Sequence, residues 1–311
     1  MIRVFQSLPE ARAALRSSAV TIGKYDGMHR GHQAILQQLQ QEAARLQTTS
    51  LVILSEPQPE EFFAGSAAPA RLNAFHDKVG FLEQFGIDAV YRLAFDGAVS
   101  RQPARNFVEE VLLAGLRMKS IVVGEDFRFG YQRQGSVGML AELAPVHGFA
   151  LNAVPPCVDG GERISSTLIR QYLEQGECQR VSQCLGRPYS ISGEVVKGRQ
   201  LGRVLGFPTA NIALKINRLP LSGIFVVTAQ EGGVERKGVA SIGYNPTVSA
   251  DDKAKLEVFL FDFDGDIYGC DMKVNFLHKL RDEKRFSDLS GLKQQMMLDV
   301  SEAKRFFGMP L

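Results

Sequence analysis

The stretch AVTIGKYDGMHRGHQAIL (residues 19–36) joins an apolar, β-branched run to a glycine-containing turn and then to a helical pattern. Similar runs alternate with helical patterns as far as residue 154, which predicts a doubly wound α/β domain with a Rossmann-like parallel sheet. Ligands of such domains gather at the carboxyl ends of the strands. The predicted strands are 19–23, 51–54, 88–93, 119–124 and 149–154, and the predicted helices are 31–46, 76–85, 103–114 and 136–147.

A second type of pattern follows the stretch VPPCVDGGER (residues 154–163), in which paired prolines and glycines interrupt the periodicity. Residues 166–185 are predicted to form a helical linker. Beyond residue 186 strand-like runs follow one another without helices, which indicates an antiparallel sheet or small barrel, and residues 289–307 are predicted to form a closing helix. We therefore expect two domains, 1–185 and 186–311.

Composition narrows the class of protein. Of the 311 residues 45% are hydrophobic and 23% are charged, as in ordinary globular proteins, and the formal net charge is +2. This balance gives no reason to expect nucleic acid or a membrane as a partner, and it carries no signal for an oligomeric state. Residues 1–18 show an amphipathic helical pattern without an apolar signal core, so we expect a cytoplasmic protein.

The turn in residues 19–36 carries the first group of candidate residues. His29 and His32 stand three residues apart where a helix is predicted to begin, so both imidazoles can face one ligand. A helix N-terminus offers unpaired N–H groups and partial positive charge, and Gly31 lets a phosphate approach the backbone closely. A metal-binding pair or a surface position without function is also compatible with the two histidines.

Two further groups occur in the first predicted domain. In ISSTLIRQYL, Ser166 and Thr167 stand at the start of a predicted helix and Arg170 follows one turn later, so hydroxyls and a guanidinium converge on one end. A serine that only caps the helix is the alternative. In VVGEDFRFG, Asp126 follows a predicted strand at its carboxyl end, where it can bind a ligand or simply be solvated.

The second predicted domain begins with the glycine-rich segment VVKGRQLGRVLGFPTAN. Gly198, Gly202 and Gly206 can wrap a phosphate chain with backbone N–H groups, although a purely structural turn is equally compatible. Thr209 and Asn211 then offer two neutral oxygens. Because they are two residues apart in a predicted strand, both can reach one Mg²⁺ ion.

In LEVFLFDFDGDIYG, Glu257 is predicted to share a strand face with Phe259, Phe261 and Phe263. A carboxylate on an aromatic face is partly desolvated, which raises its proton affinity and suits it to accept a proton from a hydroxyl group. A glutamate at a sheet edge that pairs with a lysine is the alternative.

These residues also carry a resemblance. HRGH is similar to the HxGH signature of nucleotidyltransferases, and together with YDG, GEDFRFG and ISSTLIR it resembles the adenylyltransferase domain of bacterial bifunctional riboflavin kinase/FAD synthetases. GRVLGFPTAN, GIFVV, GVASIGYNPT, LEVFLFDFDGDIYG and FLHKLRDEKRF stand in the order of riboflavin kinase domains. The resemblance implies an α/β nucleotidyltransferase domain, then a six-stranded antiparallel β-barrel with a C-terminal helix.

The resemblance further implies that riboflavin is phosphorylated to FMN and that FMN attacks the α-phosphate of a second ATP, releasing pyrophosphate and forming FAD. ATP is then a co-substrate and Mg²⁺ a cofactor. His29, His32 and Glu257 would be catalytic, with Glu257 deprotonating the ribityl hydroxyl group, and Thr209 and Asn211 would hold the metal. The implied nucleotide-binding residues are Gly23, Asp26, Gly31, Asp126, Ser166, Thr167, Arg170, Gly198, Gly202 and Gly206. The implied flavin-binding residues are Phe127, Arg281 and Arg285.

Four positions depart from the family's usual residues. Lys24 replaces an asparagine beside the predicted phosphate pocket, where it can either strengthen anion binding or displace the metal, and Gln58 replaces a common histidine. Ser241 and Asn245 replace an asparagine and an arginine. Two other interpretations therefore stay open: a kinase with an impaired adenylyltransferase domain, and a flavin-binding regulatory protein without chemistry.

Overall fold

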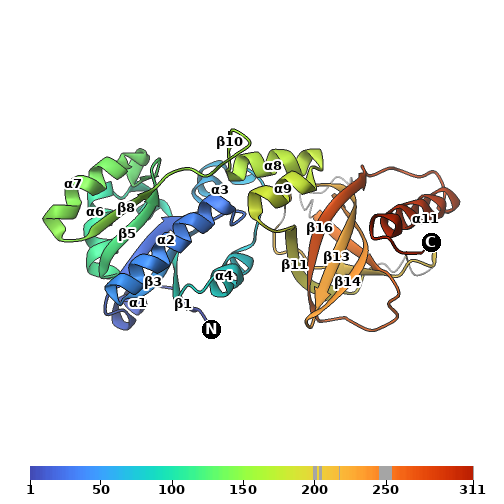
Figure 1. Ribbon diagram of the computed structural model, residues 1–311, viewed down its shortest axis with the longest axis horizontal. Helices are drawn as coiled ribbons and strands as arrows, with labels where there is room; N and C mark the ends of the chain where they lie inside the picture. The colour runs from blue at the N-terminus through green and yellow to red at the C-terminus, as the bar shows by residue number, and fades with distance from the viewer. Residues whose placement is uncertain (199–201, 203–204, 217, 245–253, 311) are drawn as a thin grey trace. The chain divides into compact units, whose positions relative to one another are not determined.

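The structure is a computed structural model that describes residues 1–198, 202, 205–216, 218–244 and 254–310 (Figure 1). The chain forms two compact units. The first unit consists of Met1–Pro69 and Phe75–Ser165, and the second consists of Ala70–Ala74 and Ser166–Leu311. Each unit is described by itself below.

The first unit is built on one six-stranded sheet in the order β1-β4-β3-β2-β5-β8, and every neighbouring pair is parallel. The predicted doubly wound α/β class is confirmed. The predicted amphipathic helix at the N-terminus is wrong for its first residues, because they pair with β4 as an edge strand too short to show alternation. The strands are β1 (Arg3–Phe5), β2 (Ser18–Gly23), β3 (Thr49–Glu56), β4 (Ala89–Ala94), β5 (Met118–Gly124) and β8 (Ala150–Val154).

Both faces of this sheet are buried, which explains why its strands read as continuous apolar runs. Val20 and Ile53 pack into a core with the helices of one face, and Ala19 and Val52 pack into a second core under α2 and α4. Successive residues of a strand therefore serve opposite faces. The helices are α1 (Leu8–Ala14), α2 (Arg30–Leu46), α3 (Pro59–Ala64), α4 (Phe75–Gln84), α5 (Gly97–Arg101), α6 (Ala104–Asn106), the π-helix η2 (Phe107–Gly115) and α7 (Val137–His147).

The predicted helix at residues 103–114 is thus a short α-helix that continues as a π-helix, a winding that apolar periodicity does not distinguish. Four short strands and two 3₁₀ turns complete the unit. These are η1 (Gly65–Ala67), β6 (Arg128–Phe129), η3 (Tyr131–Arg133), β7 (Gly135–Ser136), β9 (Val158–Asp159) and β10 (Glu162–Arg163).

The second unit contains a closed antiparallel barrel in the order β11-β12-β15-β14-β13-β16, as expected (Figure 1). Alternate residues of β15 point inward, so Leu256, Val258 and Leu260 are buried in the barrel. A helix at the C-terminal end of the chain packs on the outside through Ala303. The elements are β11 (Tyr189–Val196), β12 (Thr209–Ile212), β13 (Gly223–Glu231), β14 (Val234–Tyr244), β15 (Ala254–Leu260), β16 (Asp271–Arg281) and the closing helix α11 (Leu289–Phe306).

Two local predictions in this unit are wrong. The linker is not one helix but two, α8 (Ser166–Gln175) and α9 (Cys178–Leu185), because Gly176 between them adopts a left-handed φ of 77°. The strand that carries Glu257 ends at Leu260, because Asp262 also has a positive φ, of 51°. Phe261 and Phe263 therefore lie beyond the strand rather than along its face.

Two candidate active sites, one in each unit

The first site is built on the loop between β2 and α2. Tyr25, Gly27 and Met28 all have positive φ, of 49°, 87° and 48°. Two of these residues carry side chains that disfavour this conformation, so surrounding contacts must hold the loop. One such contact joins the hydroxyl oxygens of Tyr25 and Thr21 at 2.7 Å. The chain is thereby turned sharply from the carboxyl end of β2 into the N-terminus of α2.

His29 and His32 lie together at this helix N-terminus, as predicted. His29 is the N-cap residue, and its Nδ1 accepts a hydrogen bond from the backbone N–H of His32 at 3.3 Å. The imidazole rings stack with centroids 3.7 Å apart. Because Nδ1 acts as the acceptor, the neutral His29 ring carries its hydrogen on Nε2, which makes that nitrogen a donor. A Cβ at Gly31 would lie 3.2 Å from the His29 ring, so a glycine there avoids crowding it.

His32 is held neutral by its surroundings. Burial lowers the pKa of its imidazole well below the usual value, and electrostatic interactions with His29, Lys78 and Lys24 lower it further. Its Nδ1 is buried without a hydrogen-bond partner among the described residues. A polar atom buried in this way costs free energy until a ligand satisfies it. The loop and the helix start therefore suit an anionic ligand.

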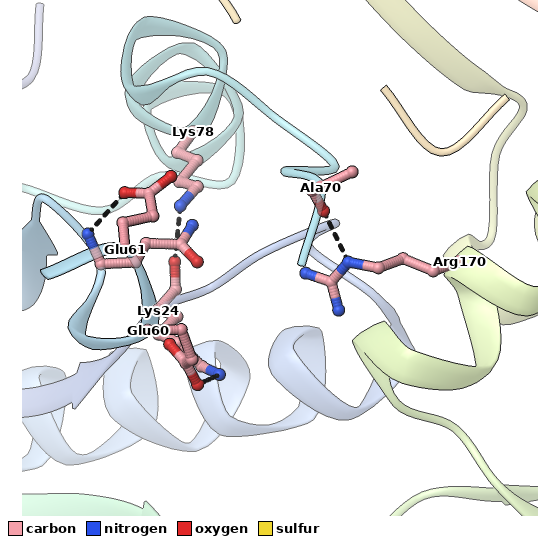
Figure 2. A network of polar contacts seen from close by, with 7 residues as sticks. Lys24, Glu60, Glu61, Ala70, Lys78 and Arg170 are labelled. Carbon is pink, nitrogen blue, oxygen red and sulfur yellow. Dashed lines mark hydrogen bonds and ion pairs between the residues drawn. The ribbon is translucent and has the colours of Figure 1, made fainter. Parts of the chain in front are cut away.

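Lys78 is a residue of this site that sequence reasoning missed. Its side chain is 2% exposed, and its Nζ donates to the backbone carbonyl of Lys24 at 2.8 Å (Figure 2). A lysine inside the apolar stripe of α4 was the available signal, because a buried ammonium group needs a specific partner. Lys24 Nζ in turn donates to Glu60 Oε1 at 2.5 Å (Figure 2).

The other predicted residues of the first unit have different environments. Gly23 ends β2, and the fully buried Asp26 lies inside the loop. Asp126 lies in the loop after β5, where its Oδ2 accepts a hydrogen bond from Arg163 at 2.6 Å, and the neighbouring Phe127 ring stacks on Phe129 with centroids 5.4 Å apart. Gln58 is 4% exposed, and its Nε2 has no hydrogen-bond partner among the described residues.

Ser166, Thr167 and Arg170 lie on α8 and therefore belong to the second unit. Ser166 is the first residue of that helix, as predicted, and Thr167 follows it. Arg170 Nε donates to the backbone carbonyl of Ala70 at 2.6 Å within the same unit (Figure 2).

The barrel carries the second site. Asn211 on β12 and Ser241 on β14 are both direct cross-strand partners of Glu257 on β15, so the three side chains form a row on one face. Thr209 lies on the same face of β12, and its hydroxyl group donates to Glu257 Oε2 at 3.3 Å. Glu257 is half-buried. Hydroxyl, amide and carboxylate oxygens are thereby brought together on three strands.

The predicted glycines lie close to this row. A Cβ at Gly198 would collide with the side chain of Asn211, and one at Gly202 would collide with the backbone carbonyl of Phe207. Gly206 has a φ of 89°, which favours glycine. Close approach to a neighbouring backbone therefore requires a glycine at position 202, whereas position 206 favours glycine through its φ.

Arg281 has a well-defined partner. Its guanidinium Nε and Nη2 donate to the two carboxylate oxygens of Asp299 on α11 at 2.8 and 2.7 Å, and both side chains are largely buried. This ion pair holds the closing helix against β16. Arg285 lies in the exposed segment before α11, and Asn245 lies outside the described residues.

The two sites differ in how they could hold a metal. Within the described ranges no three His, Cys, Asp or Glu side chains gather as metal ligands. Thr209, Asn211 and Glu257 offer hard oxygen donors on one face, which is the chemistry that Mg²⁺ prefers, with the remaining positions left to water and phosphate. The barrel residues therefore fit Mg²⁺.

Comparison with known proteins identifies the family of the chain. A family model described as FAD synthetase matches residues 11–168, and one described as riboflavin kinase matches residues 185–307. The chain is 41% identical to a bifunctional riboflavin kinase/FMN adenylyltransferase of Pseudomonas fluorescens over 97% of each chain. The chain belongs to this bifunctional family. The expected enzyme with two activities, and with ATP as a co-substrate, is thereby confirmed.

Other members of the family are similarly close. Identity is 40% to the Escherichia coli K12 protein, over 96% of each chain, and 40% to the Haemophilus influenzae protein, over 98% of this chain and 99% of the other. Both carry the same bifunctional name. The likeness therefore extends over both domains in each relative.

A solved structure from Streptococcus pneumoniae, named as a macrolide-efflux protein, has a TM-score of 0.81 and 27% identity and covers 98% of this chain and 99% of its own. That name applies to the S. pneumoniae protein, and the likeness supports the two-unit fold. Among the described residues of the present chain, no helix combines the length and the apolar character needed to cross a membrane.

Proposed function

We propose that this riboflavin kinase/FMN adenylyltransferase performs its two reactions at the two sites described above, with His29 and His32 acting in one and Glu257 in the other. The observation that carries the proposal is that the two sites offer chemically different side chains. A stacked imidazole pair at a helix N-terminus suits phosphate binding, whereas a carboxylate beside hydroxyl and amide oxygens suits proton transfer and metal binding.

In adenylyl transfer, a phosphate oxygen of FMN attacks the α-phosphorus of ATP, and the bond to the bridging oxygen of pyrophosphate breaks. No proton has to be removed from the attacking phosphate, so the protein's task is positioning and charge stabilisation. The Nε2–H group of His29 and the ring of His32 donate to the phosphates, and Gly23, Asp26 and Gly31 shape the loop around them. Asp126 contacts the nucleotide, and Phe127 contacts the flavin.

Ser166, Thr167 and Arg170 are proposed to bind outer phosphates of ATP in adenylyl transfer. Their support is the sequence resemblance together with their place in the first turns of α8, where two hydroxyl groups and a guanidinium group lie near the positive end of the helix dipole. On that basis the adenylyltransferase function extends through α8 and α9. We accordingly place the functional boundary between residues 185 and 186, where the riboflavin kinase match also begins.

In the kinase reaction, the 5′-hydroxyl oxygen of riboflavin attacks the γ-phosphorus of ATP, its proton passes to Glu257, and ADP leaves. Thr209 and Asn211 hold Mg²⁺, which when bound neutralises charge on the phosphates. The segment that contains Gly198, Gly202 and Gly206 covers the phosphates. Arg285 closes over the flavin. Arg281 supports the segment that carries Arg285, through its ion pair with Asp299.

We also place the enzyme in the cytoplasm. All four cysteines are free thiols, as is usual in a reducing compartment, and both reactions consume ATP. The two alternative functions are not favoured, because both family models match and the relatives carry both activities in their names.

Chromatography of the products made from riboflavin, ATP and Mg²⁺ tests the function as a whole. FMN should appear first and FAD after it, and FMN supplied directly should give FAD and pyrophosphate. FMN without FAD would leave only the kinase, and bound flavin without ADP or pyrophosphate would show a binding protein.

A further inference from the structure

Lys24 is held at both ends by different groups. Its backbone carbonyl accepts a hydrogen bond from the buried Lys78 ammonium group at 2.8 Å, and its own ammonium group donates to the Glu60 carboxylate at 2.5 Å (Figure 2). Lys78 thereby fixes the backbone of Lys24 at the start of the strained loop. The side chain of Lys24 is anchored by Glu60 on α3.

The positive charge of Lys24 acts on the imidazole of His32. Burial is the main reason why the pKa of His32 is low, but electrostatic interactions with His29, Lys78 and Lys24 add to the effect. Such an influence requires the Lys24 ammonium group to lie within electrostatic range of the ring. Two lysines therefore make the surroundings of His32 positive.

The ion pair between Lys24 and Glu60 can be exchanged. The side chain of Lys24 is 45% exposed and that of Glu60 is 38% exposed, so water competes with the contact and the pair is weak. A triphosphate carries more negative charge than a carboxylate, and its oxygens bind ammonium groups well. A polyphosphate that reaches Lys24 can therefore compete with Glu60 for the ammonium group.

We propose that Lys24 is a phosphate-binding residue of adenylyl transfer in this chain and that Glu60 is its exchange partner. In the free enzyme the ammonium group stays on Glu60. When ATP binds beside His29 and His32, the ammonium group moves to the triphosphate, and it returns to Glu60 as pyrophosphate leaves. The proposal rests on adenylyl transfer at the histidine site, and an asparagine at position 24 could not act in this way because an amide carries no charge.

The test compares four variants of the full chain: Lys24→Met, Lys24→Arg, Glu60→Gln and the double variant Lys24→Met/Glu60→Gln. FAD formation from FMN is followed at varied ATP concentrations, and pyrophosphate is used as a product inhibitor. Lys119→Met is the matched control, because this exposed lysine lies near the start of β5, away from the carboxyl ends of the strands. FMN formation from riboflavin and the thermal midpoint report on folding.

The two partners should give effects of opposite sign. Lys24→Met should raise the KM for ATP and the inhibition constant of pyrophosphate about tenfold, which corresponds to one charge-assisted hydrogen bond. Glu60→Gln should lower both, because the competing carboxylate is gone. The double variant should behave like Lys24→Met, and Lys24→Arg should retain most of the affinity.

An ordinary structural ion pair would behave differently. Loss of either partner would then change the KM in the same direction, together with the thermal midpoint, and the double variant would resemble either single one. That pattern, or an unchanged KM in Lys24→Met, overturns the exchange model. If the unaltered chain itself formed no FAD from FMN, the function of the histidine site would be at fault, rather than the role of Lys24.

Discussion

His29 Nδ1 and the backbone N–H of His32 are joined by a hydrogen bond of 3.3 Å, so one imidazole both caps α2 and presents its other nitrogen as a donor. Capping fixes the ring in place, and the ring in turn stacks on its partner. With the function proposed above, the same side chain contributes both to stability and to ligand binding, and substitutions can separate the two contributions.

Replacing His29 should abolish FAD formation and spare FMN formation from riboflavin. We expect His29→Asn to reduce the rate of adenylyl transfer about 100-fold or more, because a preorganised donor is lost. Asparagine is a good N-cap, so the free energy of unfolding of His29→Asn should stay near that of the unaltered protein. The free energy of unfolding of His29→Ala should fall by about 1 kcal/mol, because alanine does not cap the helix. Product chromatography and urea unfolding measure the two effects. Loss of both activities in folded protein would contradict separate sites.

Glu257→Gln should have the reverse effect. The amide keeps the shape and the contact with Thr209 but cannot accept the ribityl proton, so FMN formation should fall about 10²- to 10⁴-fold while FAD formation from supplied FMN continues. Glu194→Gln, an exposed change on β11, is the control and should leave both rates unchanged. Full kinase activity in Glu257→Gln would show that another group takes the proton.

Stability should fall in mild acid because of His32. Its pKa lies well below 6.5 in the folded protein, mainly through burial. Below about pH 6.5 the unfolded chain takes up a proton at this residue that the folded chain does not, so the free energy of unfolding decreases, by at most about 1.4 kcal/mol per pH unit. Urea midpoints from pH 7.5 to 5.0 should therefore fall less steeply for His32→Gln. Equal slopes would show that His32 does not contribute to the loss of stability in acid.

The ion pair between Arg281 and Asp299 should be a strong determinant of barrel stability. Asp299→Ala leaves a buried guanidinium group without its carboxylate, which typically costs about 3 kcal/mol or more. Asp282→Ala removes a carboxylate that is 83% exposed and paired with Lys279, and the midpoint of unfolding should not move measurably. Equal effects of the two substitutions would show that burial does not determine how much an ion pair contributes to the stability of the barrel.

Much of the fold could be predicted because burial leaves a pattern. Strands of the parallel sheet are covered on both faces and read as apolar runs, and the barrel strands follow one another without helices. The edge strand β1 pairs over only three residues, which is too short for a recognisable period. The break at Gly176 depends on a backbone conformation that helical periodicity does not contain.

The residues of the candidate sites could be predicted only where they lie in short motifs. His29, His32, Thr209, Asn211 and Glu257 lie in compact motifs, and the structure joins them within each motif or across neighbouring strands. Lys78 and Asp299 were missed because each acts through a partner distant in the sequence, at Lys24 and at Arg281. Contacts of this kind arise only after the chain has folded.

The segment Ala70–Ala74 belongs to the second unit although the sequence on either side of it belongs to the first. The buried hydroxyl group of Tyr189 donates to the carbonyl of Leu72 at 2.8 Å, and Arg170 donates to that of Ala70. A gene split between the two catalytic regions would leave this acceptor segment on the wrong polypeptide. The buried hydroxyl group of Tyr189 would then lose its acceptor at Leu72, so separating the two regions would make the second polypeptide less stable.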